Sequence, residues 1–233
     1  MKMGKTFTFV AAAGVVVALA AFVGSAQADP IEPYRLAFIT STDTGTVGSD
    51  GEIMTDIAHY NAHVQALADA AGIGDTSTLL PNGVRWYVIG STADVDARDN
   101  TGTNPDISDG VPVYNLVDDT LIALNNKDLW DGEVVNTINY DETGALKSHW
   151  PFTGTGPDGT QATANFGPLG QIGGDVAQGQ SSVTTNWIHR SWTGDPPTTG
   201  LPMYAMSEII PEPATMSLLV LGGLAMLRRR RRA

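Results

Sequence analysis

The sequence predicts an α+β fold in a single domain, residues 29–210. Three observations carry this prediction. Apolar runs typical of buried strands lie near both ends of the segment, an amphipathic helical pattern follows the first run, and the second half is dominated by Gly, Thr, Pro, Asn and Gln. Strands at both ends of a domain favour one sheet in which the first and last strands pair.

The first two elements have the clearest patterns. Residues 34–41 form an apolar run that ends in polar turn residues, which is typical of a buried strand. From Glu52 to Ala71, apolar residues recur every three or four positions. This spacing predicts an amphipathic helix that ends at Gly72.

The later elements are shorter. Segment 121–130 is either a strand or a short helix, and its pattern leaves both assignments open. After Gly154 the composition favours long structured loops over regular elements. Further strands or extended segments are expected at 84–89, 111–116 and 203–209.

Residues 211–233 combine three features in order. Pro211-Glu212-Pro213 cannot continue a helix, because proline lacks the backbone donor and biases the preceding residue toward extended geometry. The uncharged run 214–227 predicts a transmembrane helix. Its length of roughly 21 Å spans a core of about 30 Å only if flanking arginines snorkel or the bilayer thins. The cations that would stay cytoplasmic are Arg228, Arg229, Arg230, Arg231 and Arg232.

This order resembles the PEP-CTERM sorting signal of Gram-negative envelope proteins. The resemblance implies that Pro211-Glu212-Pro213 is the recognition motif, that 214–227 is a temporary inner-membrane anchor and that 228–232 orient it. It also implies processing by an exosortase, a membrane-embedded cysteine transpeptidase-like enzyme, at a position that the sequence does not define. The alternative is an ordinary tail anchor that is never cut.

Residues 1–28 predict a signal peptide. Lys2 and Lys5 precede an apolar stretch, 7–23, and Ala26-Gln27-Ala28 supplies the small residues that a signal peptidase reads. We therefore expect the mature chain to begin at Asp29. A retained N-terminal transmembrane helix is the competing interpretation.

Charge and cysteine content limit the partners. Between Asp29 and Ile210, six basic residues stand against 24 acidic ones, a formal charge of −18. Such a domain is repelled by nucleic acid and by anionic membrane surfaces, so cations or neutral glycans are better partners. The chain has no cysteine, which excludes disulfides and thiolate chemistry, so packing alone must stabilise the fold.

Several short segments occur in an order that resembles an endostatin-type variant of the C-type lectin-like fold, over residues 34–208. The resemblance implies that fold for the whole domain. The segments are 35–39, 59–66, 72–74, 86–92, 111–116, 152–159 and 203–207.

The departures from that family limit what carries over. Its disulfide positions correspond to alanines here, such as Ala62, Ala164 and Ala205. Its heparin-binding arginines have no counterpart on so acidic a domain. Asn104-Pro105-Asp106 partly matches the calcium-site triplet of sugar-binding members, but no Trp-Asn-Asp follows it.

Asp94, Asp96 and Asp99 form the strongest candidate metal site. Three carboxylates on one turn-rich segment supply the hard oxygen ligands that calcium prefers, so a calcium cofactor is conceivable although none is required. The EF-hand spacing is absent. The alternative is that these short side chains cap helices and turns, with an ion pair to Arg98.

Two other groups have weaker patterns. His59 and His63 are four residues apart on the expected helix, where two imidazoles could share a metal, but both are expected to be solvated. A second acidic group surrounds Trp130 and either borders a cation or glycan site or forms a solvated face. Its members are Asp128, Asp131, Glu133, Asp141 and Glu142.

Catalysis has little support in the sequence. Ser181 and Ser182 miss the Gly-x-Ser-x-Gly elbow, and the spacing of His149 and His189 does not mark either as a base. The late aromatic residues either stack on sugars or, as we favour, fill the space beneath long loops. They are Trp130, Trp150, Phe152, Phe166, Trp187 and Trp192.

These observations predict a non-enzymatic, exported cell-envelope or extracellular-matrix protein with a structural or binding role. Its expected partners are signal peptidase, an exosortase, the inner membrane transiently and an exopolysaccharide; nucleic acid is not expected. It would pass through an inner-membrane anchored intermediate to the cell surface, outer membrane or matrix. Two alternatives stay open: a glycan- or calcium-binding lectin-like module and a secreted hydrolase.

Overall fold

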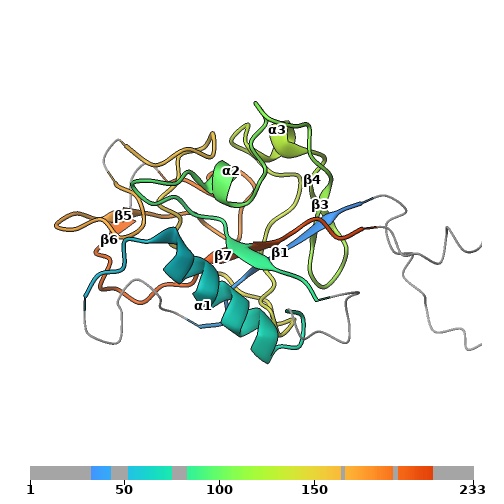
Figure 1. Cartoon of the computed structure of the whole chain (residues 1–233), viewed down its shortest axis with the longest axis horizontal. Helices are drawn as coiled ribbons and strands as arrows, with labels where there is room; N and C mark the ends of the chain where they lie inside the picture. The colour runs from blue at the N-terminus through green and yellow to red at the C-terminus, as the bar shows by residue number, and fades with distance from the viewer. Residues whose placement is uncertain (1–32, 43–51, 75–82, 164–165, 191–193, 212–233) are drawn as a thin grey trace, which may run out of the picture.

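The computed structural model describes residues 33–42, 52–74, 83–163, 166–190 and 194–211 (Figure 1). The signal-peptidase residues Ala26, Ala28 and Asp29, the apolar run 214–227 and the arginines 228–232 lie outside these ranges. Within them, no helix has the length and apolar character needed to cross a membrane.

A five-stranded sheet forms the centre of the fold, in the order β2-β7-β1-β3-β4. The first strand, β1 (Arg35–Ile39), pairs antiparallel with the last, β7 (Tyr204–Ser207), with Phe38 opposite Ala205. It pairs in parallel with β3 (Val113–Asn115) on its other side. The α+β class and the pairing of first and last strands are thus confirmed.

Helix α1 (Ile57–Ala70) begins five residues later than predicted. Asp56 is its N-cap, and the Asp56 carboxylate accepts a hydrogen bond from the Ala58 backbone at 2.9 Å. The Tyr60 hydroxyl donates to the Met54 carbonyl at 2.6 Å. This bond holds the segment before Asp56 against α1 without making it part of the helix. The predicted end is confirmed, because Gly72 follows the C-cap with a φ of 76°.

The remaining elements are short. Strand β2 (Trp86–Val88) follows α1, and α2 (Ala97–Asn100) follows β2. Segment 121–130 contains both of its predicted alternatives, β4 (Leu121–Ala123) and α3 (Asn126–Leu129). The later half is mostly irregular, as predicted, with a two-stranded sheet of β5 (Val176–Ala177) and β6 (Gly194–Asp195).

The sheet is buried on both faces, because alternate side chains of its strands enter two separate cores. Leu36 and Phe38 of β1 pack with α1, which runs alongside β2 (Figure 1). Ala37 and Ile39 pack on the opposite face, against residues of the loop-rich half. The second core is covered mainly by loops, with one residue each from the four-residue helices α2 and α3 (Ala97 and Leu129). Its large side chains include Trp130, Trp187, Leu129 and Ile138.

The outer edge of β2 is closed by side-chain amides. Gln65 of α1 accepts from the Trp86 backbone at 2.8 Å, and Asn61 accepts from the Val88 backbone at 2.9 Å. Asn100 donates to the Val88 carbonyl at 2.8 Å and exchanges hydrogen bonds with Asn61. Since a free strand edge pairs readily with another chain, these amides disfavour association through β2.

The C-type lectin-like assignment stays a prediction. An α+β sheet with paired terminal strands fits it, but this arrangement is not specific to one family. Of the alanines that the resemblance would set at cysteine positions, Ala62 is exposed, Ala205 is buried and Ala164 lies outside the described residues.

Candidate sorting site and surrounding side-chain clusters

The Pro-Glu-Pro motif begins where the fold ends. Ile210 is buried, and its backbone exchanges two hydrogen bonds with Tyr34, at 2.8 and 3.2 Å. Pro211, the next residue, is exposed. Glu212 and Pro213 lie outside the described residues. The folded part of the chain therefore closes at Ile210, directly before the exposed Pro211 that begins the motif.

Side chains strengthen this closure. The buried Arg35 guanidinium donates to the Ser207 carbonyl at 2.7 Å, and the Ser207 hydroxyl accepts from the Leu36 backbone at 2.9 Å. Glu208 donates from its backbone to the Arg85 carbonyl at 2.8 Å. Because Tyr34 and Ile210 are paired, the two ends of the described domain lie side by side (Figure 1).

The candidate calcium residues Asp94, Asp96 and Asp99 have different surroundings. Asp96 is the N-cap of α2, but its carboxylate accepts from the Gln161 backbone at 2.7 Å and makes no capping bond. Asp99 accepts from the Asn104 side chain at 2.6 Å, and Asp94 is exposed. Across the described ranges, no group of three or more acidic or histidine side chains is arranged to hold a metal.

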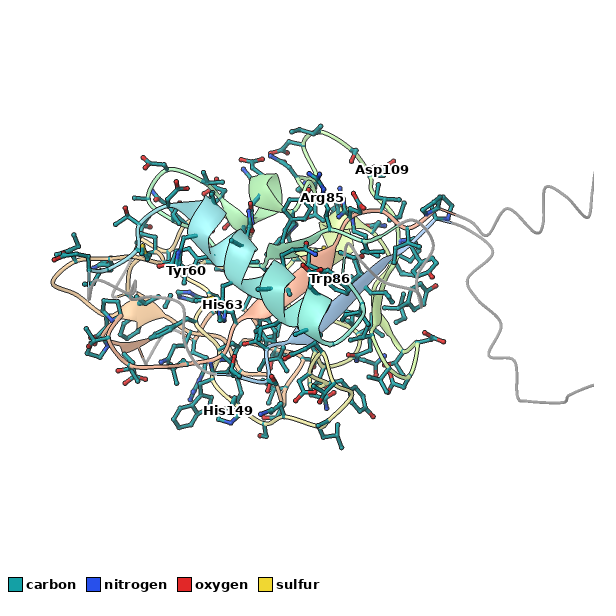
Figure 2. The ribbon with its side chains drawn as sticks, turned by 60° about the horizontal axis from the view of Figure 1, so that its bottom comes forward. Tyr60, His63, Arg85, Trp86, Asp109 and His149 are labelled. Carbon is teal, nitrogen blue, oxygen red and sulfur yellow. The ribbon has the colours of Figure 1, made fainter. Side chains whose placement is uncertain are left out.

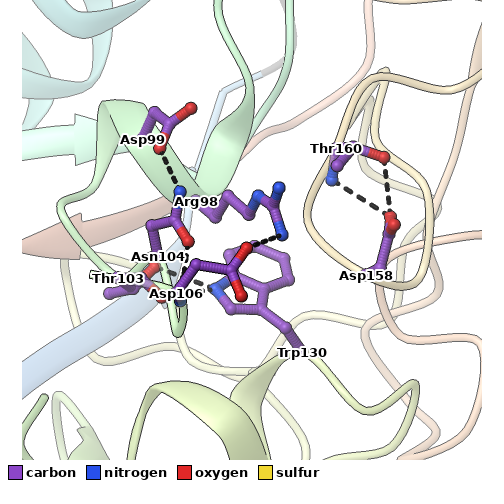
Figure 3. Close-up of polar contacts among 8 residues, drawn as sticks. All are labelled: Arg98, Asp99, Thr103, Asn104, Asp106, Trp130, Asp158 and Thr160. Carbon is purple, nitrogen blue, oxygen red and sulfur yellow. Dashed lines mark hydrogen bonds and ion pairs between the residues drawn. The ribbon is translucent and has the colours of Figure 1, made fainter. Parts of the chain in front are cut away.

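Arg98 forms its ion pair with Asp106 instead of with these aspartates, at 3.6 Å (Figure 3). Across from Arg98, the Asp158 carboxylate accepts from the Thr160 hydroxyl at 2.7 Å. Burial raises the pKa of Asp158, but the bonds from Thr160 and the charge of Arg98 outweigh burial, and the net pKa is lowered. The Arg98 backbone donates to the Gly159 carbonyl at 3.2 Å, and the Asp96 carboxylate accepts from the Gln161 backbone, so these two bonds fasten the 156–161 loop to the start of α2.

Trp130 packs next to Arg98 and the 156–161 loop. Its indole N–H donates to the Thr103 hydroxyl at 2.9 Å, and a Cβ at Gly159 would lie 2.7 Å from its ring (Figure 3). Trp130 is buried, so it offers no exposed ring face beside the second acidic group.

All five members of this acidic group accept hydrogen bonds from the local backbone or a neighbouring side chain. Asp128 accepts from the Leu124 backbone at 2.7 Å, and Asp131 accepts from the Glu133 backbone at 3.1 Å. Glu142 is buried and accepts from both the backbone and the hydroxyl of Ser41.

The prediction that both histidines of α1 are solvated is wrong for His63. The His63 Nε2 atom is buried and has no hydrogen-bond partner within the described part of the chain. Burial lowers the pKa of His63, the nearby His59 lowers it further, and Glu142 acts in the opposite direction. His63, labelled in Figure 2, therefore favours the neutral form because of its surroundings.

The candidate nucleophile Ser181 is buried and bonded to main chain. Its hydroxyl donates to the Lys147 carbonyl at 3.2 Å and accepts from the His149 backbone at 3.0 Å. These bonds join the 147–149 segment to the 178–182 segment. The His189 ring contacts the Thr155 carbonyl at 3.0 Å.

The late aromatic residues divide into two groups. Trp130, Phe152 and Trp187 are buried, which confirms for them the predicted role of filling space beneath the loops. Trp150 is 50% exposed, and the Arg190 guanidinium lies 4.8 Å from its ring centroid. Sequence reasoning missed this pair, because the two residues are 40 positions apart and no local pattern links them. Trp192 lies outside the described residues.

The comparisons with known proteins bear on the sorting motif. Residues 210–232 match the family model of the PEP-CTERM protein-sorting motif. No curated protein matches the chain. The match includes Pro211-Glu212-Pro213, the apolar run and the arginines, and it supports export, a membrane-anchored intermediate and sorting to the cell surface by an exosortase. The chain thus carries a PEP-CTERM sorting signal, joined directly to the last residue of its folded domain.

Proposed function

We propose that this protein is a non-enzymatic component of the cell envelope or extracellular matrix. Signal peptidase removes residues 1–28, the 214–227 segment anchors the chain in the inner membrane, and an exosortase processes it at the Pro-Glu-Pro motif. The domain is then released or transferred to the outer surface. No cofactor is part of this proposal.

The position of the motif is the observation that carries the proposal. All described sheet pairing ends at or before Ile210, and Pro211 is exposed. Cleavage in exposed chain beyond the last paired residue costs the fold no hydrogen bond. The domain is therefore built to survive removal of its anchor intact.

Replacing Pro211, Glu212 and Pro213 together by alanine tests this proposal. We expect the variant to accumulate as an inner-membrane precursor, and its amount at the cell surface to fall at least tenfold. Fractionation followed by intact mass measurement reads both quantities. The matched control is Pro196→Ala, which alters an exposed proline outside the motif and should leave sorting unchanged. A triple variant that loses its arginine tail and reaches the surface like the unaltered protein would rule the proposal out.

Glycan binding is the second candidate function, and the half-exposed Trp150 favours it. Aromatic rings that present one face to solvent provide the apolar contact on which sugar rings stack. The resemblance to the C-type lectin-like fold is consistent with a glycan-binding role. A hydrolase lacks comparable support, since the Ser181 hydroxyl is bonded to backbone.

A further inference from the structure

The sorting motif has almost no free chain on either side. Ile210 is 2% exposed and paired with Tyr34, and Pro211 follows it directly. On the other side, Pro213 is followed at once by the apolar run 214–227. Three residues in extended conformation reach about 10 Å. In an anchored precursor, only this short distance separates the folded domain from the segment that enters the bilayer.

One edge of the central sheet faces this short connection. Strands β1, β2 and β3 begin at the edge where β7 ends, because β7 is antiparallel to β1 and β2, and β1 is parallel to β3. Figure 1 shows β1 and β7 side by side. The residues that flank the strands at this edge are Tyr34, Arg85, Pro112 and Glu208. A membrane-embedded enzyme that acts at the motif therefore meets this edge of the sheet.

The motif supplies little extended chain to such an enzyme. A peptide bound in a groove as an extended strand is held through its main-chain groups as well as its side chains. For a reacting bond anywhere in the motif, the four residues on its domain side reach back at least to Ile210. Both backbone polar groups of Ile210 are already bonded to Tyr34. The enzyme and Tyr34 thus compete for the same backbone groups.

Residues 208–210 are held less firmly than the strand before them. β7 lies between β1 and β2 and is paired on both sides. Beyond its end, the Glu208 backbone donates to the Arg85 carbonyl on the β2 side, and Ile210 pairs with Tyr34 on the β1 side. Ile209, between them, is 46% exposed. This three-residue segment can therefore leave the sheet while β7 stays paired.

We propose that residues 208–210 detach from the sheet and enter the substrate groove of the processing enzyme as an extended strand. Their backbone groups then bond to the enzyme in place of Tyr34 and Arg85. After processing, the segment returns to the sheet, so the finished domain keeps all of its pairing. The inference rests on the proposed function and adds the part of the folded domain that the enzyme binds.

A disulfide across the Tyr34–Ile210 pair tests this inference. The two residues exchange both backbone hydrogen bonds, and in such antiparallel pairs the Cα atoms are about 5.5 Å apart, which suits a disulfide. The chain has no cysteine of its own, so Tyr34→Cys with Ile210→Cys forms a single intramolecular crosslink. In cells that contain the enzyme, we expect the crosslinked full chain to be converted from precursor to mature form at least tenfold more slowly than the parent, as measured by pulse-chase.

Two further variants separate access to the groove from loss of packing. Tyr34→Ser with Ile210→Ser makes the same truncations without a crosslink, so it should be processed at least as fast as the parent. The second variant keeps the crosslink and carries eight Gly and Ser residues between Ile210 and Pro211. It should regain the parental rate, because the inserted residues supply about 26 Å of extended chain in place of residues 208–210.

Two results would overturn the inference. If the crosslinked variant is processed at the parental rate, the enzyme accepts the motif with the sheet intact. If the inserted residues do not restore processing, the crosslink acts through something other than the position of residues 208–210. Both results leave the sorting proposal standing, since that proposal fails only if the parent protein itself reaches the surface with Arg228–Arg232 attached.

Discussion

Trp187→Ala is expected to lower the free energy of unfolding by about 3–5 kcal/mol, a large share of the 5–15 kcal/mol typical of a domain. Trp187 is fully buried between Trp130 and Tyr204, with ring centroids 5.9 and 5.8 Å away. On this face of the sheet the helices of the described chain contribute only Ala97 of α2 and Leu129 of α3, and the chain has no disulfide to hold the loops. Chemical denaturation monitored by circular dichroism measures the effect.

Trp150→Ala provides the matched control for this experiment. It removes the same side chain from a half-exposed position, so its expected cost is below about 1 kcal/mol, mainly from the lost contact with Arg190. Equal destabilisation by the two variants would show that the loop-rich half does not depend on a tryptophan core.

Gly154→Ala is expected to destabilise the domain by about 3 kcal/mol or more. Gly154 has a φ of 60°, and an added Cβ would lie 2.2 Å from the Leu169 nitrogen and 2.6 Å from the Ser91 carbonyl oxygen. Both neighbours are backbone atoms that are hydrogen-bonded to each other, at 2.7 Å. The clash can be relieved only by moving apart the three chain segments that contain Ser91, Gly154 and Leu169. Thermal unfolding of the purified variant measures this cost.

Gly173→Ala separates the clash from the backbone conformation. Gly173 also has a positive φ, 76°, but an added Cβ would meet nothing within 4 Å. Both variants carry the cost of a left-handed residue, about 1–2 kcal/mol, and only Gly154→Ala adds the steric cost. If the two variants unfold at the same temperature, the added Cβ at Gly154 does not clash with the Ser91 and Leu169 backbones.

The sequence predicts the elements whose patterns are local. The 34–41 run, the end of α1 at Gly72 and the early-strand segments 84–89 and 111–116 all correspond to observed elements. The start of α1 was missed because periodicity continues through Ile53, whereas the Asp56 cap and the Tyr60 bond to Met54 place the boundary. A cap and a long-range side-chain bond compete with periodicity at such boundaries.

Side-chain surroundings depend on tertiary contacts and were less predictable. His63 was expected to be solvated, but the domain buries its Nε2 atom. Asp96 looked like a helix cap, yet its carboxylate reaches Gln161, which is 65 residues away.

The absence of cysteine explains why these contacts matter for an exported protein. A domain delivered outside the cell through a removable anchor must stay folded without disulfides and without its anchor. The Tyr34–Ile210 pairing closes the fold just before the motif, and the second core fixes the loops. The residues that stabilise the domain thus end at Ile210, and the sorting motif begins with Pro211.

The mass of the protein recovered from the cell exterior tests the central claim most directly. We predict a chain that begins at Asp29, contains the whole domain through Ile210, and lacks Arg228–Arg232 because processing occurred at the Pro-Glu-Pro motif. Recovery of surface or matrix protein that retains the five arginines would contradict the claim that the C-terminal segment is a removable anchor.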